Sequence, residues 1–359
     1  MLHLSLIANP MDKKIFPSPA IESENVCLEV TTRCTNECTH CFVRAGGAVS
    51  HDLSLEIARS IIEEGSRYGY RCLHITGGEP FLWPYIFDLL DCAVGAGYQM
   101  FLINTNGSLI TQHIAMRLSG FGGRITLSIS LQGPEDLHDR IRGHGSFQKA
   151  IGGIRAALDA GLSVVIFTTI GRSLVALLPG FAEFVFANLA GVKELALIQL
   201  IRVSRDTHSL DGELLTPFDF IRMVRSAVLL NLYGYRTIVL ENPLAAVAAG
   251  LMEMPRLPLA LPLYRNGKIV VMADRSITLA HSSRRAYGIY ETGMLRSVLM
   301  SEDYAAAVSP DVETCPYCRF HGVCGDYGMI RPSEWFRDME METPYCKRVL
   351  GLIDSNVIV

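Results

Sequence analysis

The feature that most restricts the fold is a repeated alternation of short apolar runs and longer amphipathic runs between residues 25 and 230. The short runs are rich in β-branched residues, as strands are, and the longer runs have apolar residues at helical spacing. The predicted strands are 26–31, 71–76, 99–104, 124–130, 162–169 and 194–200, and the predicted helices are 54–67, 84–97, 111–119, 147–160, 175–188 and 216–232. Six strand–helix units in succession predict an α/β fold with a parallel sheet and right-handed crossovers.

Two architectures accommodate six such units: a doubly wound open sheet and a partial (β/α)6 TIM-like barrel. Distinctive runs follow four successive strands, at residues 33–41, 77–80, 104–107 and 130–134. In a barrel, the loops after the strands converge on one mouth, where binding sites are built. The position of these runs therefore favours the partial barrel.

Three cysteines, Cys34, Cys38 and Cys41, stand in one short run after the first predicted strand. A [4Fe–4S] cluster has four irons, so three thiolates leave one iron open for a small-molecule ligand. The alternative is a zinc site completed by His40 or a distant cysteine, although structural zinc rarely uses this spacing. The triplet therefore predicts a metal cluster that holds something else.

The triplet has the pattern C-x3-C-x-aromatic-C, with His40 in the aromatic slot, and the next predicted strand ends in Gly77-Gly78-Glu79-Pro80. In this combination the sequence resembles the radical S-adenosylmethionine (SAM) superfamily over roughly residues 24–230. The resemblance implies that the open iron chelates the amino and carboxylate groups of SAM. Reductive cleavage of SAM then gives a 5′-deoxyadenosyl radical that abstracts a substrate hydrogen, while the protein orients the reactants.

The resemblance also implies which residues contact SAM. Gly77 and Gly78 offer a backbone that can approach a ligand closely, and with Glu79 and Pro80 they form the cradle for the methionine amine.

Three further cofactor-binding residues follow from the same resemblance. Thr105 and Ser130 line the SAM site, and Arg142 reaches the SAM carboxylate, with Arg140 as a rival for that role. Gln132 stands where the family usually has aspartate, which is a departure in this loop.

A second cysteine group lies near the C-terminus, with the spacing C-x2-C-x5-C-x21-C, and consists of Cys315, Cys318, Cys324 and Cys346. By spacing alone it suits tetrahedral zinc or a fully ligated [4Fe–4S] cluster equally well. The tail resembles the SPASM extension of radical SAM enzymes, which implies an auxiliary [4Fe–4S] cluster.

The full SPASM pattern has a second, inner auxiliary cluster, and three of its cysteine positions carry Tyr264, His281 and Gly328 here. We therefore expect one auxiliary cluster only. Tyr264 and His281 are candidate catalytic residues near the substrate, or ordinary packing residues. Sulfatase-maturing relatives have an aspartate base where this chain has Ser282, which argues against that activity.

Composition excludes several classes. Hydrophobic residues make up 49% of the 359, and a net charge of −4 without a basic block argues against nucleic-acid binding. The sequence has no signal-peptide pattern or membrane span. Its ten cysteines therefore suggest metal binding in a cytoplasmic protein. Cys27, Cys72 and Cys92 are expected to be ordinary buried cysteines.

We predict four segments: an N-terminal extension (1–23), the radical SAM partial barrel (24–235), an irregular proline-punctuated linker (236–262) and a small SPASM-like Fe–S domain (263–359). A hairpin is predicted at 268–272 and 276–279. Only 33 residues precede Cys34, so a peptide-recognition domain is expected to be a separate protein.

The resulting hypothesis is a radical SAM oxidoreductase with SAM and two [4Fe–4S] clusters, one for SAM and one auxiliary. It would complete an oxidative crosslink or dehydrogenation, on a ribosomally made peptide in the first interpretation. The alternatives are a dehydrogenase of a sugar or aminocyclitol alcohol and, in another class, a non-catalytic zinc-stabilised binding protein. A flavodoxin- or ferredoxin-type protein is the expected electron donor.

Overall fold

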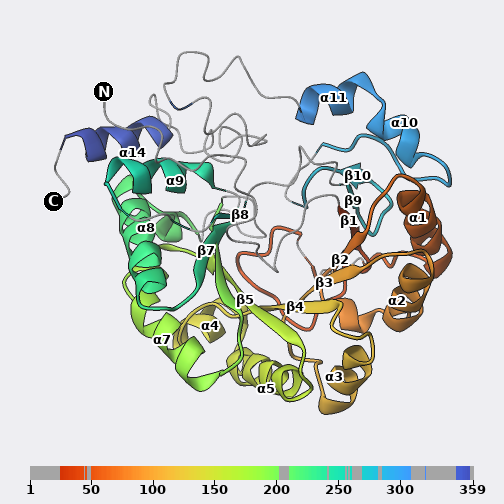
Figure 1. Cartoon of the computed structure of the whole chain (residues 1–359), viewed down its shortest axis with the longest axis horizontal. Coiled ribbons are helices and arrows are strands. Elements are labelled where there is room, and N and C mark those ends of the chain that lie inside the picture. The colour runs from red at the N-terminus through yellow and green to blue at the C-terminus, as the bar shows by residue number, and fades with distance from the viewer. Residues whose placement is uncertain are drawn as a thin grey trace.

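The computed structural model describes residues 25–43, 45–46, 50–201, 210–240, 242–254, 257, 259–260, 269–281, 285–308, 320 and 345–355. In this part of the chain a single sheet has the order β10-β9-β1-β2-β3-β4-β5-β6-β7-β8. The sheet curves around a centre and carries its helices on the outside (Figure 1). This arrangement confirms the predicted partial TIM-like barrel, since a doubly wound sheet has helices on both faces.

All six predicted strands are present, and neighbouring strands pair in parallel: β1 (Asn25–Glu29), β2 (Cys72–Thr76), β3 (Met100–Thr105), β4 (Ile125–Ser130), β5 (Ser163–Ile170) and β6 (Glu194–Gln199). Because parallel strands share one direction, their carboxyl ends lie at the same edge of the sheet. The cysteine triplet and the Gly-Gly-Glu-Pro run follow β1 and β2 at this edge.

The six predicted helices are also present and connect the strands: α1 (Leu55–Arg67), α2 (Ile86–Gly95), α3 (Gln112–Ser119), α5 (Ser146–Asp159), α7 (Leu178–Asn188) and α8 (Pro217–Leu232). Local sequence explains their starts. Ser54 caps α1 by accepting from the Ile57 amide, and Thr216 and Asp219 form a capping box before Pro217 on α8.

Four shorter elements were not predicted: the helices α4 (Glu135–Arg142) and α6 (Arg172–Val175) and the 3-10 turns η2 (Pro80–Leu82) and η3 (Asp211–Glu213). The helix α4 follows β4 directly and ends at Gly143, whose φ is +104°. It brings the His138-to-Arg142 segment to the mouth of the barrel.

Residues 236–262 contain more regular structure than the predicted irregular linker. They include β7 (Thr237–Leu240), α9 (Pro243–Leu251) and β8 (Leu259–Ala260), and β7 and β8 extend the sheet beyond β6. The expectation of irregular structure was wrong here because Pro243 stands in the first turn of α9, where its missing N–H costs nothing. The division of the chain into domains stays a prediction.

The predicted hairpin is formed by β9 (Ile269–Val271) and β10 (Ile277–Thr278), which pair antiparallel. β9 also pairs in parallel with β1, so the hairpin continues the sheet at its first strand. The helices α10 (Leu295–Leu299) and α11 (Glu302–Val308) follow it, and α14 (Tyr345–Asp354) packs against α8 and α9.

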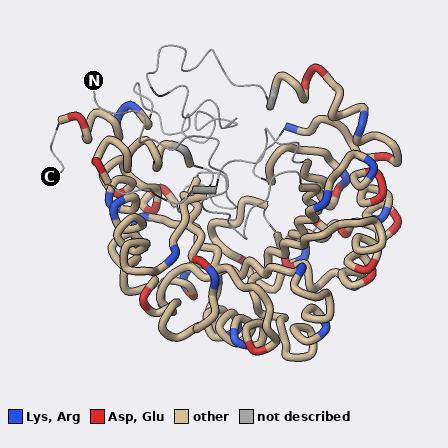
Figure 2. The backbone as a smooth tube through the Cα atoms, in the orientation of Figure 1, with Lys and Arg blue, Asp and Glu red and all other residues tan. Residues whose placement is uncertain are grey.

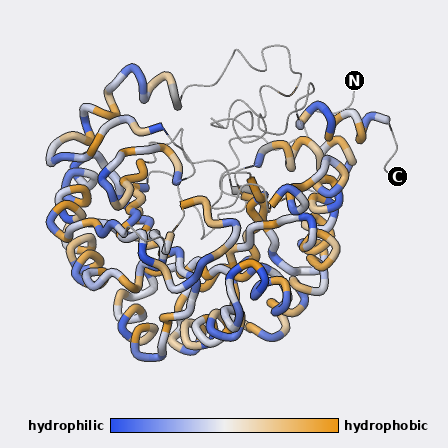
Figure 3. The backbone as a smooth tube through the Cα atoms, turned by 180° about the vertical axis from the view of Figure 1, so that it is seen from behind, coloured by the Kyte–Doolittle hydropathy of each residue, from blue (hydrophilic) through white to orange (hydrophobic). Residues whose placement is uncertain are grey.

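The main apolar core lies between the sheet and the outer helices. It takes alternate strand residues, such as Leu127 and Ile129 of β4 and Val164 and Ile166 of β5. Figure 3 shows apolar and polar stretches alternating along the helices, as expected when one helix face is buried. Charged residues lie mostly on the outer helices in Figure 2. No helix in the described ranges is long and apolar enough to cross a membrane.

Candidate cofactor site

The cysteine loop begins directly after β1 and is held by backbone contacts. The Asn36 amide lies 3.4 Å from the Cys34 sulfur, and the Ala45 amide lies 3.3 Å from the Cys41 sulfur. Amide hydrogen bonds to sulfur are typical of cluster ligands and tune their potential. Burial raises the pKa of the Cys34 thiol to about 11, and a coordinating metal would stabilise its thiolate form.

The three thiols of the loop lie close to one another, because Cys38 and Cys41 both act to raise the pKa of Cys34. Within the described residues, no group of three His, Cys, Asp or Glu side chains has the geometry of a mononuclear metal site. In a cluster, each cysteine would bind a different iron. The cluster and the zinc alternative both stay predictions.

The glycine turn after β2 packs directly on the cysteine loop. The Gly78 amide donates to the Thr31 carbonyl at 2.7 Å, and the Glu79 amide donates to the Arg33 carbonyl at 2.8 Å. A Cβ added to Gly78 would lie 2.2 Å from the Arg33 oxygen, and one on Gly77 would lie 2.6 Å from the Thr31 oxygen. These glycines are thus required for loop–loop packing, a role that the sequence did not indicate.

The Glu79 carboxylate is fully buried and joins the ends of β2 and β3. It accepts from the Thr105 hydroxyl at 2.7 Å, from the Asn106 amide at 2.8 Å and from the Phe81 amide at 3.3 Å. Burial raises the pKa of Glu79 to about 7, against the lowering effect of these donors. Both carboxylate oxygens of Glu79 therefore accept hydrogen bonds from the protein itself, and the Thr105 hydroxyl is one of the donors.

Asn106 is a functional candidate that the sequence reasoning missed. Its side-chain amide donates to the Thr35 hydroxyl at 2.8 Å and lies 3.8 Å from the Cys34 sulfur. Its position beside Thr105 in the run 104–107 was the one feature of the sequence that could have identified it. Sequence spacing does not reveal its contact with a loop more than 70 residues away.

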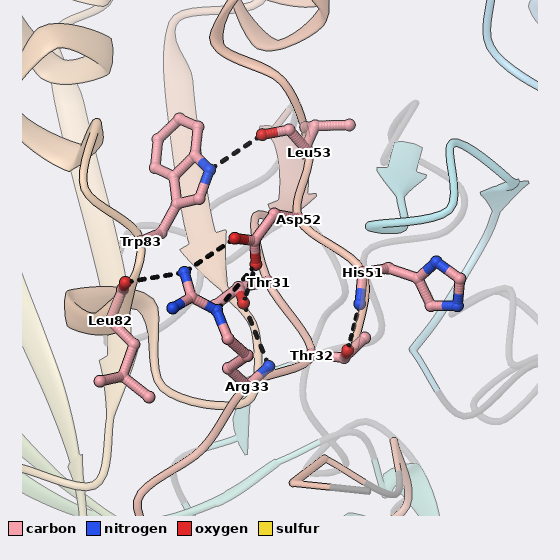
Figure 4. Close-up of polar contacts among 8 residues, drawn as sticks. All are labelled: Thr31, Thr32, Arg33, His51, Asp52, Leu53, Leu82 and Trp83. Atoms are coloured by element: carbon pink, nitrogen blue, oxygen red, sulfur yellow. Dashed lines mark hydrogen bonds and ion pairs between the residues drawn. The ribbon is translucent and has the colours of Figure 1, made fainter. Parts of the chain in front are cut away.

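A polar network lies around Arg33, just before the cysteine triplet (Figure 4). The Arg33 guanidinium donates to both oxygens of Asp52, at 2.7 and 3.1 Å, and to the Leu82 carbonyl at 2.9 Å. The Thr31 hydroxyl also donates to Asp52. Arg33 thus ties the loop after β1 to η2, directly beside the first cluster cysteine.

The end of β4 contributes a second set of buried polar groups. Arg142 is buried at the end of α4, whereas Arg140 is exposed, so the geometry favours Arg142 over its rival. The Thr39 amide donates to the Ile141 carbonyl at 3.0 Å, which fixes α4 to the cysteine loop. Burial, and then the charge of Arg142, lower the pKa of His40 in that loop. Ser130 lies half-buried at the last position of β4.

Three buried nitrogens at this end lack a hydrogen-bond partner within the described part of the chain: Gln132 Nε2, His138 Nε2 and Arg142 Nε. Buried donors without partners are costly, so these three nitrogens call for an acceptor. SAM carries one such acceptor, its carboxylate. These residues therefore fit the cofactor that the sequence predicts.

Other predicted residues fall in different places. His281 follows β10, and its Nε2 lies 3.5 Å from the Cys27 sulfur, while its ring stands edge-on to those of His74 and Phe42. Cys346 lies half-buried at the start of α14. Tyr264, Ser282, Cys315, Cys318, Cys324 and Gly328 lie outside the described residues.

Comparison with curated proteins finds relatives over the barrel. A mycofactocin maturase MftC from Mycobacterium tuberculosis is 35% identical over 161 residues, which are 44% of this chain and 41% of that protein. An AdoMet-dependent heme synthase from Oleidesulfovibrio alaskensis is 33% identical over 150 residues, 41% of this chain and 38% of that protein. The chain thus matches about two fifths of these relatives' length, and their names describe different reactions.

Comparison with solved structures extends the likeness beyond the barrel. The structure of anSMEcpe with bound AdoMet and a peptide has a TM-score of 0.67 at 16% identity, covering 93% of this chain and 100% of that one. Streptococcus suis SuiB bound to its precursor peptide SuiA has a TM-score of 0.61 at 14% identity, covering 84% of this chain and 71% of that one. At these identities the likeness shows the fold.

A family profile matches part of the chain. The profile described as the radical SAM superfamily covers residues 28–174, which span β1 to α6 and include the cysteine triplet and the glycine turn. This match agrees with the convergence of both runs at one edge of the sheet, and it identifies residues 28–174 as a radical SAM domain.

Proposed function

We propose that this protein is a radical SAM enzyme that carries out an oxidative modification of a ribosomally made peptide. The observation that supports this most directly is the joining of two loops at the barrel mouth. The loop with Cys34, Cys38 and Cys41 is hydrogen-bonded to the Gly77–Glu79 turn and to α4, so three segments far apart in the sequence meet there.

The chain's own residues bind and orient the cofactors. Cys34, Cys38 and Cys41 would hold a [4Fe–4S] cluster, with His40 between the last two. The Gly77-to-Pro80 turn would face the amine of SAM, held in place by the Glu79 contacts with Thr105 and Asn106. Ser130 would line the site, and Arg142 would pair with the SAM carboxylate.

When bound, the cluster and SAM supply a one-electron reductive cleavage that generates a 5′-deoxyadenosyl radical for hydrogen abstraction. An oxidative outcome also requires an acceptor for a second electron. We assign this role to an auxiliary [4Fe–4S] cluster on Cys315, Cys318, Cys324 and Cys346. A flavodoxin- or ferredoxin-type protein would supply the reducing electron.

A peptide substrate is supported by two structural relatives, since anSMEcpe and SuiB were both solved with peptides bound. A separate small recognition protein could present such a peptide. The curated relatives also include heme synthases, and the sugar or aminocyclitol alcohol remains the alternative substrate. The assay below therefore compares these classes.

The test is anaerobic reconstitution followed by iron and sulfide analysis. About eight irons per chain are expected for two cubanes, and about four for one. Stoichiometric zinc without sulfide would instead support the non-catalytic binding protein. Incubation with SAM and dithionite should then release 5′-deoxyadenosine. Mass spectrometry of added peptides, aminocyclitols and porphyrins should reveal the substrate by a loss of two hydrogens.

The auxiliary cluster has its own test. Changing Cys315 to Ala should leave SAM cleavage measurable while product formation falls, because only the second electron transfer is interrupted. Loss of both activities in folded protein that retains about four irons would contradict an electron-acceptor role.

A further inference from the structure

Two buried donors lie on one face of α4. His138 is 1% exposed and Arg142 is 9% exposed, and four residues separate them, so their side chains are neighbours on the helix surface. The His138 Nε2 and the Arg142 Nε have no hydrogen-bond partner in the described ranges. Two adjacent buried donors that both lack an acceptor form an incomplete site for a ligand with an anionic oxygen.

The hydrogen bonds of His138 determine its tautomer. Its Nδ1 accepts from the Gln132 backbone amide at 3.1 Å, so Nδ1 carries no proton. Burial, and then the positive charge of Arg142, lower the pKa of His138 to about 3, against the opposing charge of Asp139. A neutral imidazole with a bare Nδ1 carries its proton on Nε2, which makes the unpartnered nitrogen a donor.

The surrounding groups leave this donor available. Asp139, the nearest carboxylate on the same helix, accepts from the Gly145 and Phe147 amides and from the Ser146 hydroxyl. The Phe147 ring of α5 stands edge-on to the imidazole at 5.6 Å. His40 of the cysteine loop lies near enough for Arg142 and His138 to help lower its pKa. The helix therefore offers one permanent charge and one neutral donor side by side.

We propose that His138 is a cofactor-positioning residue, which donates its Nε2–H to the SAM carboxylate beside Arg142. The inference rests on the proposed function, because it requires that SAM binds at this mouth. Arg142 supplies the charge, and His138 adds a directed hydrogen bond that fixes the rotation of the carboxylate. A hydrogen bond to a charged acceptor in a buried site is worth about tenfold or more in affinity.

Two variants separate the two ring nitrogens. In His138→Asn the side-chain amide can still accept from Gln132 near the Nδ1 position, but nothing reaches the Nε2 position. In His138→Gln the amide reaches the Nε2 position and can donate. SAM affinity, measured by equilibrium dialysis on the reconstituted protein, should fall about tenfold or more in His138→Asn and recover in part in His138→Gln.

Decarboxylated SAM provides the matched ligand. Because it lacks the proposed acceptor, it should bind to wild type and His138→Asn with equal affinity. Since His138 is neutral, the affinity ratio between wild type and His138→Asn should also stay constant between about pH 6 and pH 8. Iron content and circular dichroism report whether each variant is folded and loaded.

The outcomes distinguish the two claims. If reconstituted wild type does not bind SAM, the proposed function fails and this inference fails with it. If wild type binds SAM and a folded, iron-loaded His138→Asn binds it equally well, only the inference is overturned. An equal loss of affinity for SAM and decarboxylated SAM would also overturn it, because the carboxylate would then not be the partner.

Discussion

The two halves of the barrel wall turn different side chains toward the interior. In strands β1, β2 and β4, apolar residues that pack against the helices alternate with inward residues that include the polar Glu29, His74 and Ser128. In β5 to β7 the inward positions form a separate apolar cluster of Val165, Ala196, Ile238 and Leu240 with Phe167 and Ile198. The residues predicted to contact SAM lie within or directly after β1 to β4.

This difference teaches that one sheet serves two purposes. The polar half ends in loops that hydrogen-bond to one another, so it can present donors and thiols at fixed positions. In the apolar half the inward side chains pack on one another as one cluster. Substitutions in the polar half should therefore affect cofactor binding, whereas those in the apolar half should affect stability only.

The largest effect is expected for Cys34→Ala. Removing one of the three thiolates should lower the iron content by about four per chain and abolish SAM cleavage. Cys92→Ala is the matched control, because Cys92 is a half-buried thiol on α2 outside the mouth. A Cys34→Ala protein that keeps its iron and cleaves SAM would contradict the assignment of Cys34 as a cluster ligand at the end of the polar half.

A large structural effect is expected for Gly78→Ala. The new methyl group would lie 2.2 Å from the Arg33 carbonyl oxygen, so the two loops must separate. We expect a loss of about 3 kcal/mol in the free energy of unfolding, measured with urea. In the apolar half, Gly180→Ala on α7 meets no atom within 4 Å and should be neutral or slightly stabilising. Equal effects at both glycines would refute the role of loop packing.

The third prediction concerns the pH dependence of stability. Glu29 is 3% exposed on β1, and burial raises its pKa to about 7. Between pH 4.5, its ordinary pKa, and about 7, the unfolded chain loses this proton while the native protein keeps it. Its contribution to the free energy of unfolding should therefore fall as pH rises through this window, by at most about 3 kcal/mol.

The variant Glu29→Gln cannot ionise and should flatten this part of the stability profile, measured by urea unfolding at about pH 5 and pH 7.5. Exposed Glu56→Gln on α1 is the control and should leave the slope unchanged. An unchanged slope in Glu29→Gln would mean that another group causes the dependence.

The smallest effect is expected for Val165→Thr in the apolar half. The change keeps the side-chain shape but buries a hydroxyl among apolar neighbours, which should cost about 1–2 kcal/mol of stability. SAM affinity should stay at the wild-type value. A fall in SAM affinity without loss of stability would show that the apolar half also takes part in cofactor binding.

Much of the fold could be predicted from the sequence because its signals are local. The six strands, the six helices and the hairpin follow from residue periodicity. The cysteine triplet and the Gly-Gly-Glu-Pro run are short enough to recognise as motifs. The helix and strands within residues 236–262 were not predicted, because prolines such as Pro243 occur both at the start of helices and in loops.

The site was only partly predictable for the same reason. Thr105 was selected from its run, but its neighbour Asn106 was not, although Asn106 reaches the Cys34 loop. Arg142 and Arg140 were rivals until burial separated them. The sequence did not single out His138 as a candidate. Its proposed role depends on its tautomer, which is set by the hydrogen bond from the Gln132 backbone amide.

By itself, the sequence determined which chemical groups this protein possesses and the order in which strands and helices occur, because both are properties of neighbouring residues. The tertiary structure alone decided that Gly78 must be glycine, that Glu79 is tied to β3, and which buried donors have no partner. These properties depend on contacts between segments far apart in the chain, which the parallel pairing of the strands brings to one edge of the sheet.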